Sequence, residues 1–173
     1  MHLSITAATI HDVELLSQLS VVTFTEAFAA DNRKEDMDQY LAVEMSPAKL
    51  IGELQDSNNL FLIAWHNDEP VGYAKMATGT KNESKQLERP IELERIYVLK
   101  KHYGKKAGAR LMQYCLQYGK DNGYKTIWLG VWEQNHRAVK FYKQWGFELF
   151  GSHGFRLGSD MQTDVLMKKS LTQ

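Results

Sequence analysis

The alternation of hydrophobic and polar positions along the chain predicts helices in its first third and strands separated by helices after it. From Val13 to Val22, apolar residues recur at helical spacing, which predicts an amphipathic helix over residues 10–29. Short apolar runs bounded by turn residues predict strands. In chain order, the expected elements are a strand at 3–7, helices at 10–29, 33–44 and 48–54, strands at 60–65, 71–77 and 91–98, a helix at 105–120, a strand at 127–132, a helix at 137–145, and strands at 147–152 and 164–168.

The order of these elements predicts the fold class. Strands and helices alternate in the second half of the chain, which is typical of a mixed sheet with crossover helices. Helices that precede the first hairpin give the front of the chain an α+β character. We therefore expect an α+β fold with a mixed central sheet flanked by helices, in a single domain over residues 1–173. The polar segment 78–90 is expected to be an exposed loop.

The composition excludes several classes of protein. The chain has 173 residues, enough for an ordinary core, and its three prolines and single cysteine exclude a disulfide scaffold and a cysteine-rich zinc module. No apolar run approaches 18 residues, so no membrane span is expected. The N-terminus lacks the basic and apolar regions of a leader, and the lone thiol, Cys115, suits a reducing compartment. We expect a cytoplasmic protein.

A net charge of zero conceals an uneven distribution. Residues 1–70 carry twelve acids and three bases, a net charge of −9, so residues 71–173 carry +9. This division favours a cationic partner for the first half and an anionic partner for the second. The alternative is that both halves merely solvate their surfaces and pair with each other. The balanced total does not favour nucleic-acid binding, and the six histidines show no metal-ligand spacing, so no metal is expected.

A basic segment follows the strand at 91–98. Glycines and small residues over 104–109 stand where a helix is expected to begin, among four lysines and Arg110. The bare N–H groups and the dipole of a helix N-terminus attract anions, phosphate above all. The alternative is a lysine-rich loop that is simply soluble. Neither GxxxxGK[ST] nor GxGxxG is present, so the pattern indicates neither a nucleoside triphosphate nor a dinucleotide.

The strand and helix over 127–147 carry the most specific motif. Their pattern is Asn-x-x-Ala-x-x-Phe-Tyr-x-x-x-Gly-Phe, from Asn135 to Phe147. It resembles the second conserved block of the GNAT (GCN5-related) N-acetyltransferases, and residues 91–112 resemble the acetyl-CoA block of that superfamily. Within it, the segments Glu92–Val98 and Trp128–Glu133 are most similar to the PaiA-type branch, which acetylates spermidine and spermine. The resemblance covers most of the chain and implies the GNAT fold.

One departure from the family pattern concerns the pyrophosphate loop, which usually follows Gln/Arg-x-x-Gly-x-Gly/Ala. In register, Tyr103 replaces the polar residue and Lys106 replaces the first glycine. The Lys106 side chain either obstructs the approach of the phosphates or adds a charge there, with Gly104 supplying flexibility. The affinity for CoA, rather than the fold, depends on this difference.

The resemblance assigns roles to individual residues. Glu92 and Glu94 lie two positions apart on one strand and are expected to share a face. The resemblance implies that Glu92 is the general base, with Glu94 second, because Glu92 stands four residues before the CoA-contacting segment, where the family often has this residue. Tyr142 matches the tyrosine that protonates the departing thiolate, although it also suits an aromatic packed in the core. The acetyl-CoA site is expected to comprise Ile96, Tyr97, Val98, Tyr103, Gly104, Lys105, Lys106, Ala107, Gly108, Ala109, Asn135 and Tyr142. Glu26, Glu92 and Trp132 are expected to contact the acceptor.

Taken together, the resemblance implies an acyltransferase that moves an acetyl group from acetyl-CoA to a primary amine, a polyamine such as spermidine or spermine. Alternatives are acetylation of a protein N-terminus, a lysine or an aminoglycoside-like amine. A CoA-binding regulatory protein with weak catalysis is the alternative from another class. GNAT proteins are often dimers, which leaves a homodimer open as a partner.

Overall fold

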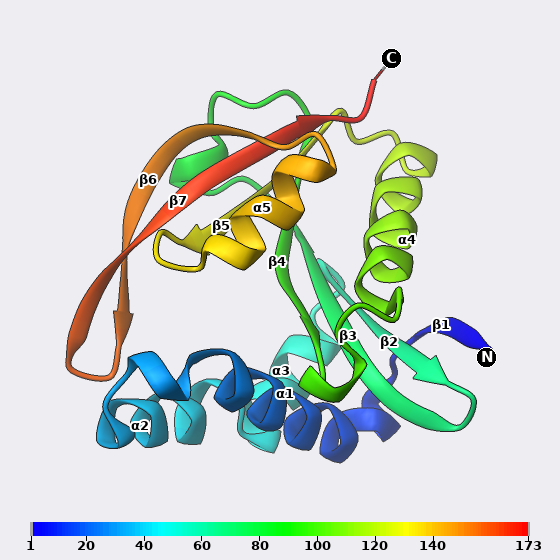
Figure 1. The fold of residues 1–173 in the computed structure, drawn as a ribbon. Helices are drawn as coiled ribbons and strands as arrows, with labels where there is room; N and C mark the ends of the chain where they lie inside the picture. Colours follow the sequence, from blue (N-terminus) through cyan, green and yellow to red (C-terminus); the bar gives the residue numbers. More distant parts are fainter. Residues whose placement is uncertain (1, 173) are drawn as a thin grey trace.

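A computed structural model describes residues 2–172, which form one seven-stranded mixed sheet with helices on both faces (Figure 1). The strand order is β1-β2-β3-β4-β5-β7-β6, and within the described residues only β4 and β5 pair in parallel. The strands are β1 (Leu3–Ala7), β2 (Asn59–His66), β3 (Glu69–Thr78), β4 (Pro90–Val98), β5 (Thr126–Trp132), β6 (Glu148–Leu157) and β7 (Asp160–Ser170).

Two layers of helices cover the sheet. On one face lie the three helices from the first third of the chain, and on the other lie the two helices from its second half (Figure 1). The helices are α1 (Val13–Phe28), α2 (Lys34–Glu44), α3 (Pro47–Gln55), α4 (Ala107–Asp121) and α5 (His136–Gln144). The mixed sheet between helices confirms the expected α+β fold.

The core is divided among three clusters, each under a different helix group. The largest joins the sheet to α4 and α5 and includes the lone thiol, Cys115, which is fully buried. Burial raises the pKa of Cys115 to about 12, so the thiol packs as a small apolar side chain. A second cluster joins α1 and α3 to β2 and β3, and a third joins α1 and α2 to β6.

The parallel pair at the centre of the sheet separates soon after it forms. The pairing of β4 with β5 covers only the positions from Pro90 to Glu92 among residues 2–172. Beyond Glu92, β4 continues to Val98 and β5 to Trp132 without pairing to each other. Two strand edges therefore face a shared opening in the middle of the sheet.

A bulge at Glu94 changes which side chains of β4 face this opening. Lys75 of β3 pairs with Arg95, but Met76 pairs with Leu93, so Glu94 is the extra residue. Before the bulge, Ile91 and Leu93 pack against α4, and after it Ile96 and Val98 do so. The bulge thus lets β4 keep one apolar face toward α4 while an additional carboxylate is inserted.

Most element boundaries lie close to those expected from the sequence, and the last two strands differ most. The Thr9–Asp12 capping box and the cap by Ser46 before Pro47 are both present. The last two strands are much longer than 147–152 and 164–168 and form a hairpin whose tip reaches α2. Glycine and polar residues over 151–154 end the apolar signal early, because this part of β6 is largely exposed. No helix within residues 2–172 is long and apolar enough to cross a membrane.

Candidate active site

The opening between β4 and β5 leads into the main cavity, which has a volume of about 1040 Å³. Its walls come from α1, α2, β4, the loop before α4, β5, α5 and the β6–β7 hairpin. Among the residues singled out in the sequence, those lining the cavity are Glu26, Glu92, Glu94, Ile96, Tyr97, Val98, Tyr103, Gly104, Lys106, Ala107, Gly108, Ala109, Trp132, Asn135 and Tyr142. Lys105 does not line it. The structure therefore brings together nearly all of the expected site.

Glu92 lies on β4 at the point where the two parallel strands separate. Its side chain is almost fully buried, and Oε1 accepts a hydrogen bond of 2.6 Å from Nζ of Lys81. Burial raises the pKa of Glu92 above its usual value, and the contact with Lys81 offsets part of that rise. A carboxylate with a raised pKa, beside the opening and at the cavity wall, has the properties of a general base.

Glu94 has a different environment although it is two residues away. Burial raises its pKa, but Lys75 and Arg95 outweigh burial, so the pKa of Glu94 lies below its usual value. Lys75 donates a hydrogen bond of 2.9 Å to Glu94, and Lys81 lies 3.9 Å from it. The two carboxylates are thus linked by Lys81, although the bulge at Glu94 breaks the strict alternation from which a shared face was expected. Their opposite pKa shifts favour Glu92 as the base.

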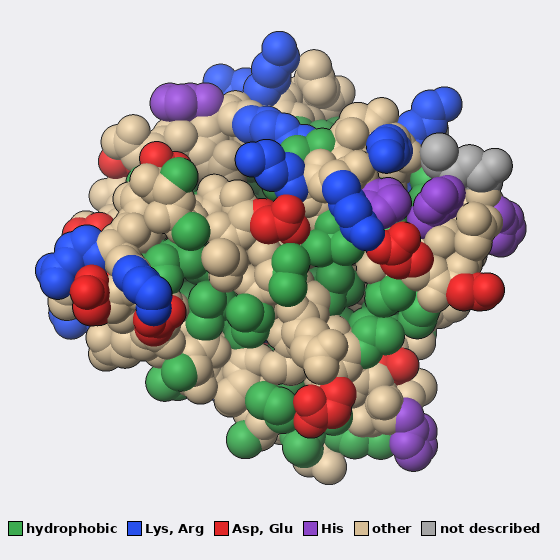
Figure 2. Space-filling view, turned by 60° about the horizontal axis from the view of Figure 1, so that its bottom comes forward, with side chains coloured by type: hydrophobic (Ala, Val, Ile, Leu, Met, Phe, Trp, Pro, Cys, Tyr) green, Lys and Arg blue, Asp and Glu red, His purple; other side chains and the backbone are tan. Residues whose placement is uncertain are grey.

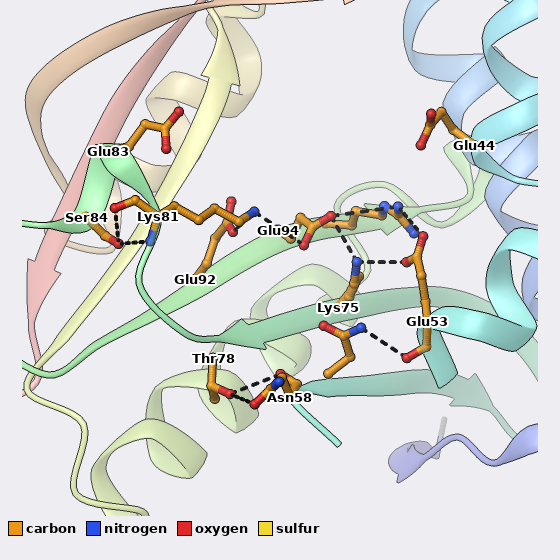
Figure 3. A network of polar contacts seen from close by, with 12 residues as sticks. Glu44, Glu53, Asn58, Lys75, Thr78, Lys81, Glu83, Ser84, Glu92 and Glu94 are labelled. Carbon is orange, nitrogen blue, oxygen red and sulfur yellow. Dashed lines mark hydrogen bonds and ion pairs between the residues drawn. The ribbon is translucent and has the colours of Figure 1, made fainter. Parts of the chain in front are cut away.

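A buried ion-pair network anchors Glu94 from behind. Glu53 of α3 contacts Nζ of Lys75 at 2.7 Å and the guanidinium of Arg95 at 3.1 Å. Figure 3 shows Lys75 of β3 contacting both Glu94 of β4 and Glu53 of α3. Because removing one member would leave a charge buried and unpaired, the network fixes the bulge in position.

The loop before α4 adopts the backbone geometry of an anion site. Gly104 and Lys106 both have positive φ angles, of 74° and 72°, and Lys106 is the N-cap residue of α4 without a side-chain cap. The N–H groups of the first turn of α4 consequently remain free for a ligand. Lys106 therefore adopts the left-handed conformation that glycine favours at the position where the family pattern has glycine.

Tyr103 and Arg137 meet across the cavity. The guanidinium carbon of Arg137 lies 3.6 Å from the centre of the Tyr103 ring, a close cation–π contact. Both residues line the cavity, one from the loop before α4 and one from the first turn of α5. Arg137 thus brings a positive charge to the position where Tyr103 replaces the usual polar residue.

Tyr142 and Asn135 each combine a structural contact with a place on the cavity wall. Tyr142 packs between Phe141 and Phe147, and burial raises the pKa of its hydroxyl above the usual value. The hydroxyl is therefore protonated at neutral pH. Asn135 caps α5, because its Oδ1 accepts a hydrogen bond of 3.2 Å from the N–H of Ala138. The capping role and the cavity position are compatible.

The acidic residues of the first third are used in several ways. Glu26 accepts a hydrogen bond of 3.4 Å from the backbone N–H of Lys100, which places it beyond the far end of β4 from Glu92. Asp36 is buried and accepts hydrogen bonds from the backbone and hydroxyl of Ser159. These bonds hold the pKa of Asp36 below its usual value.

Trp132, the other residue expected to contact the acceptor, packs edge-on against Phe28 at the wall of the cavity.

Sequence reasoning missed four polar residues around the site. The segment 78–90, expected to be only an exposed loop, carries Lys81 to Glu92 and Glu83 to His153. His153 of β6 lies 3.0 Å from Glu83 and 3.3 Å from Asp164 of β7. Burial raises the pKa of Asp164, and His153 lowers it in part. The spacing of these four residues in the sequence does not predict the contacts, because each contact joins segments that are far apart in the chain.

Comparisons with known proteins identify the family. The model described as "Acetyltransferase (GNAT) family" matches residues 21–147. An uncharacterized N-acetyltransferase of Lactobacillus delbrueckii subsp. lactis is 34% identical over 153 residues, covering 88% of each chain. An uncharacterized N-acetyltransferase of Mycobacterium tuberculosis is 31% identical over 160 residues, covering 92% of this chain and 98% of the relative.

Solved structures show the same fold. The PaiA N-acetyltransferase of Thermoplasma acidophilum, solved in complex with coenzyme A, has a TM-score of 0.82 at 22% identity and covers 98% and 99% of the two chains. The ribosomal-protein-S18-alanine N-acetyltransferase of Escherichia coli has a TM-score of 0.72 at 14% identity, covering 99% and 96%. At such identities, the similarity concerns the fold alone.

Proposed function

Because this chain belongs to the GNAT family of N-acetyltransferases, we propose that it moves the acetyl group of acetyl-CoA to a primary amine of a polyamine such as spermidine or spermine. One observation carries the choice of acceptor. Carboxylates from four elements line the cavity: Glu26, Glu44, Glu92, Glu94 and Asp164. They suit a compact molecule with several ammonium groups.

Most of the lining bases lie elsewhere and suit the other substrate. Lys106 and Arg137 lie at the starts of α4 and α5, Lys140 lies further along α5, and Arg95 is already paired with Glu53, whereas Arg156 comes from β6. This partial segregation supports a polyanionic donor at the helix starts and a cationic acceptor beside β4 and β7. The structure of a PaiA N-acetyltransferase with coenzyme A supports the same donor, and the positive φ angles at Gly104 and Lys106 fit the close approach of phosphates.

The acceptor amine must lose a proton before it attacks. An alkylamine with a pKa near 10.4 is neutral in about one molecule in a few thousand at pH 7. Glu92, with its raised pKa and its place at the cavity wall, is the residue we assign to accept that proton, directly or through water. Glu94, whose pKa is lowered by Lys75 and Arg95, stays charged and paired with them.

The remaining steps use the backbone of β4 and one hydroxyl. The N–H groups of Ile96 and Val98 lie on the free edge of β4, because the alternating N–H groups of Tyr97 and Leu99 face β3. They are assigned to the carbonyl oxygen as negative charge develops on it. The nitrogen–carbon bond forms, the carbon–sulfur bond breaks, and the thiolate takes the proton of the Tyr142 hydroxyl. The second proton, which the attacking nitrogen loses as the amide forms, restores that hydroxyl. Transfer is direct, within one ternary complex.

The proposal is tested by measuring thiol release from acetyl-CoA with spermidine, spermine, several monoamines and a blank without amine. We expect saturable release with the polyamines and little with the monoamines. Release equal to the blank for every amine would leave an untested acceptor or a CoA-binding regulator. An acetylated protein, found instead of an acetylated small molecule, would favour acetylation of an N-terminus or a lysine.

Tyr142 offers a separate prediction. Tyr142→Phe keeps the packing against Phe141 and Phe147 but removes the proton donor. We expect kcat to fall at least several-fold while acetyl-CoA binding, measured by calorimetry, stays nearly unchanged. Unchanged turnover from pH 6 to 9 would remove Tyr142 from the mechanism.

A further inference from the structure

The carboxylates beside the opening belong to a network whose charges balance. Three acids and three bases contact one another across β3, β4, α3 and the loop before β4 (Figure 3). The six residues are Glu53, Glu92, Glu94, Lys75, Lys81 and Arg95. An ammonium that enters this network adds an unmatched charge unless one of the three bases leaves.

Lys81 is the base able to leave. The side chains of Lys75 and Arg95 are 6% and 9% exposed, whereas that of Lys81 is 50% exposed. The backbone N–H of Lys81 donates to the buried Ser84 hydroxyl at 3.0 Å, so the loop stays anchored when the side chain moves. Withdrawing Lys75 or Arg95 would instead leave Glu53 buried without its partners.

The Lys81 side chain also has the chemical form of an acceptor. It is a primary ammonium on a four-carbon stem, the same group as the aminobutyl end of spermidine. Its Nζ is within hydrogen-bond reach of the carboxylate proposed as the base, at 2.6 Å from Oε1 of Glu92, and 3.9 Å from Glu94. The reacting amine requires a place at that carboxylate, so the two ammonium groups compete for it.

We propose that Lys81 is an internal occupant of the acceptor-ammonium position, which every acceptor must displace from Glu92. The proposal rests on the proposed function. A monoamine only replaces one ion pair with another and gains little. A polyamine makes the same exchange, and its further ammonium groups pair with other carboxylates of the cavity, such as Glu44 and Asp164.

The test compares initial rates of the wild type and Lys81→Met with n-butylamine and spermidine at saturating acetyl-CoA. We expect the KM values for n-butylamine and spermidine both to fall at least fivefold in Lys81→Met, by similar factors, because both amines make the same exchange at Glu92. Lys81→Arg retains the charge and should behave as the wild type. Lys85→Met, a change of another lysine on the same loop, should alter neither KM.

A second readout separates this proposal from the proposed function. Calorimetric titration of spermidine into the protein–CoA complex should show tighter binding by Lys81→Met than by the wild type, whether or not turnover occurs. Tighter binding without turnover would support the role of Lys81 and contradict the polyamine reaction. Turnover by the wild type with both KM values unchanged or raised in Lys81→Met would overturn the role of Lys81 alone. A lowered melting temperature with raised KM values would identify Lys81 as a structural anchor instead.

Discussion

Glu92 and Glu94 illustrate at the residue scale how neighbours separate two identical side chains. Both are largely buried, and burial alone would raise both pKa values. The bulge at Glu94 brings it to Lys75 and Arg95, whose charges lower its pKa, whereas Glu92 has the half-exposed Lys81 as its partner. One strand thus presents two carboxylates, of which Glu92 has the raised pKa and Glu94 the lowered pKa.

This difference predicts the acid side of the pH profile. Protonated Glu92 cannot accept a proton, so kcat/KM should fall as the pH drops through the raised pKa of Glu92 and should be restored as the pH rises. Initial rates of the wild type from pH 5 to 8 check this. In Glu92→Gln we expect a rate lower by about 100-fold or more and no acid limb. Glu94→Gln should retain the limb, and a limb lost in that variant instead would make Glu94 the base.

Lys106 is a second residue whose local geometry is decisive. Its φ angle of 72° is costly for any residue with a Cβ, by about 1–2 kcal/mol. We expect Lys106→Gly to be more stable than Lys106→Ala by about 1 kcal/mol, because both lose the charge and only alanine retains the strain. Chemical denaturation of the two variants measures the difference. Equal stability, or a more stable alanine variant, would show that the left-handed turn is not maintained in solution.

At the scale of elements, the β6–β7 hairpin closes the cavity by docking on α2. Gly158 at its tip has a φ angle of 61°, and a Cβ built there would lie 2.5 Å from the Cα of Asp36. Asp36 in turn accepts the hydrogen bonds from Ser159. The backbone of the hairpin tip therefore lies directly against the backbone of α2. Phe155 and Leu157 of β6 complete the cavity wall.

The docking of the hairpin on α2 predicts that adding one methyl group at Gly158 strongly lowers the stability of the fold. Gly158→Ala combines an unfavourable φ with a clash against the backbone of α2, so we expect a loss of at least about 2 kcal/mol in the free energy of unfolding. Gly154→Ala, on the same hairpin, is the matched control: its Cβ would lie 3.4 Å from the flexible Met161 side chain. The control should change stability by no more than about 0.5 kcal/mol. A tolerated Gly158→Ala would mean that the tip is free of α2.

At the scale of the whole molecule, local pattern predicted far more of the fold than of the site's polar partners. Helix periodicity, the Ser46–Pro47 start and the order of the elements were sufficient for the sheet and its two helical layers. Ion pairs such as Lys81–Glu92 and Glu83–His153 join segments that no periodicity relates. The bulge at Glu94 was equally hidden, because an inserted strand residue looks like any other until its partners are known.

The division of charge between the two halves of the chain is softened in three dimensions. Figure 2, which brings the lower, helical side forward, shows acidic, basic and apolar side chains interspersed. On α2, Lys34 pairs with Asp38 at 2.6 Å, and Arg33 lies 3.9 Å from Glu35. Attraction for a cationic acceptor should therefore come mainly from the cavity, rather than from the outer faces of these helices.

This distribution predicts a moderate dependence on salt. Between about 0.02 and 0.5 M ionic strength, the Debye length falls severalfold, which weakens attraction toward the mouth of the cavity. We expect the KM for spermidine to rise severalfold over this range and the KM for n-butylamine to rise less, since its charge is smaller. Steady-state kinetics at several salt concentrations test this. A spermidine KM that stays constant would contradict electrostatic attraction of the acceptor.

The early separation of β4 from β5 has a consequence for the stability of the fold. The two portions of the sheet share only the short ladder from Pro90 to Glu92. An extended ligand arm that bonds to the free edge of β4 would serve as a missing strand between them. Donor and scaffold would then be thermodynamically linked, and a donor concentration 100 times its Kd would add about 2.7 kcal/mol to the stability of the fold. The concentration of acetyl-CoA would thereby determine the lifetime of the folded enzyme as well as its rate of turnover.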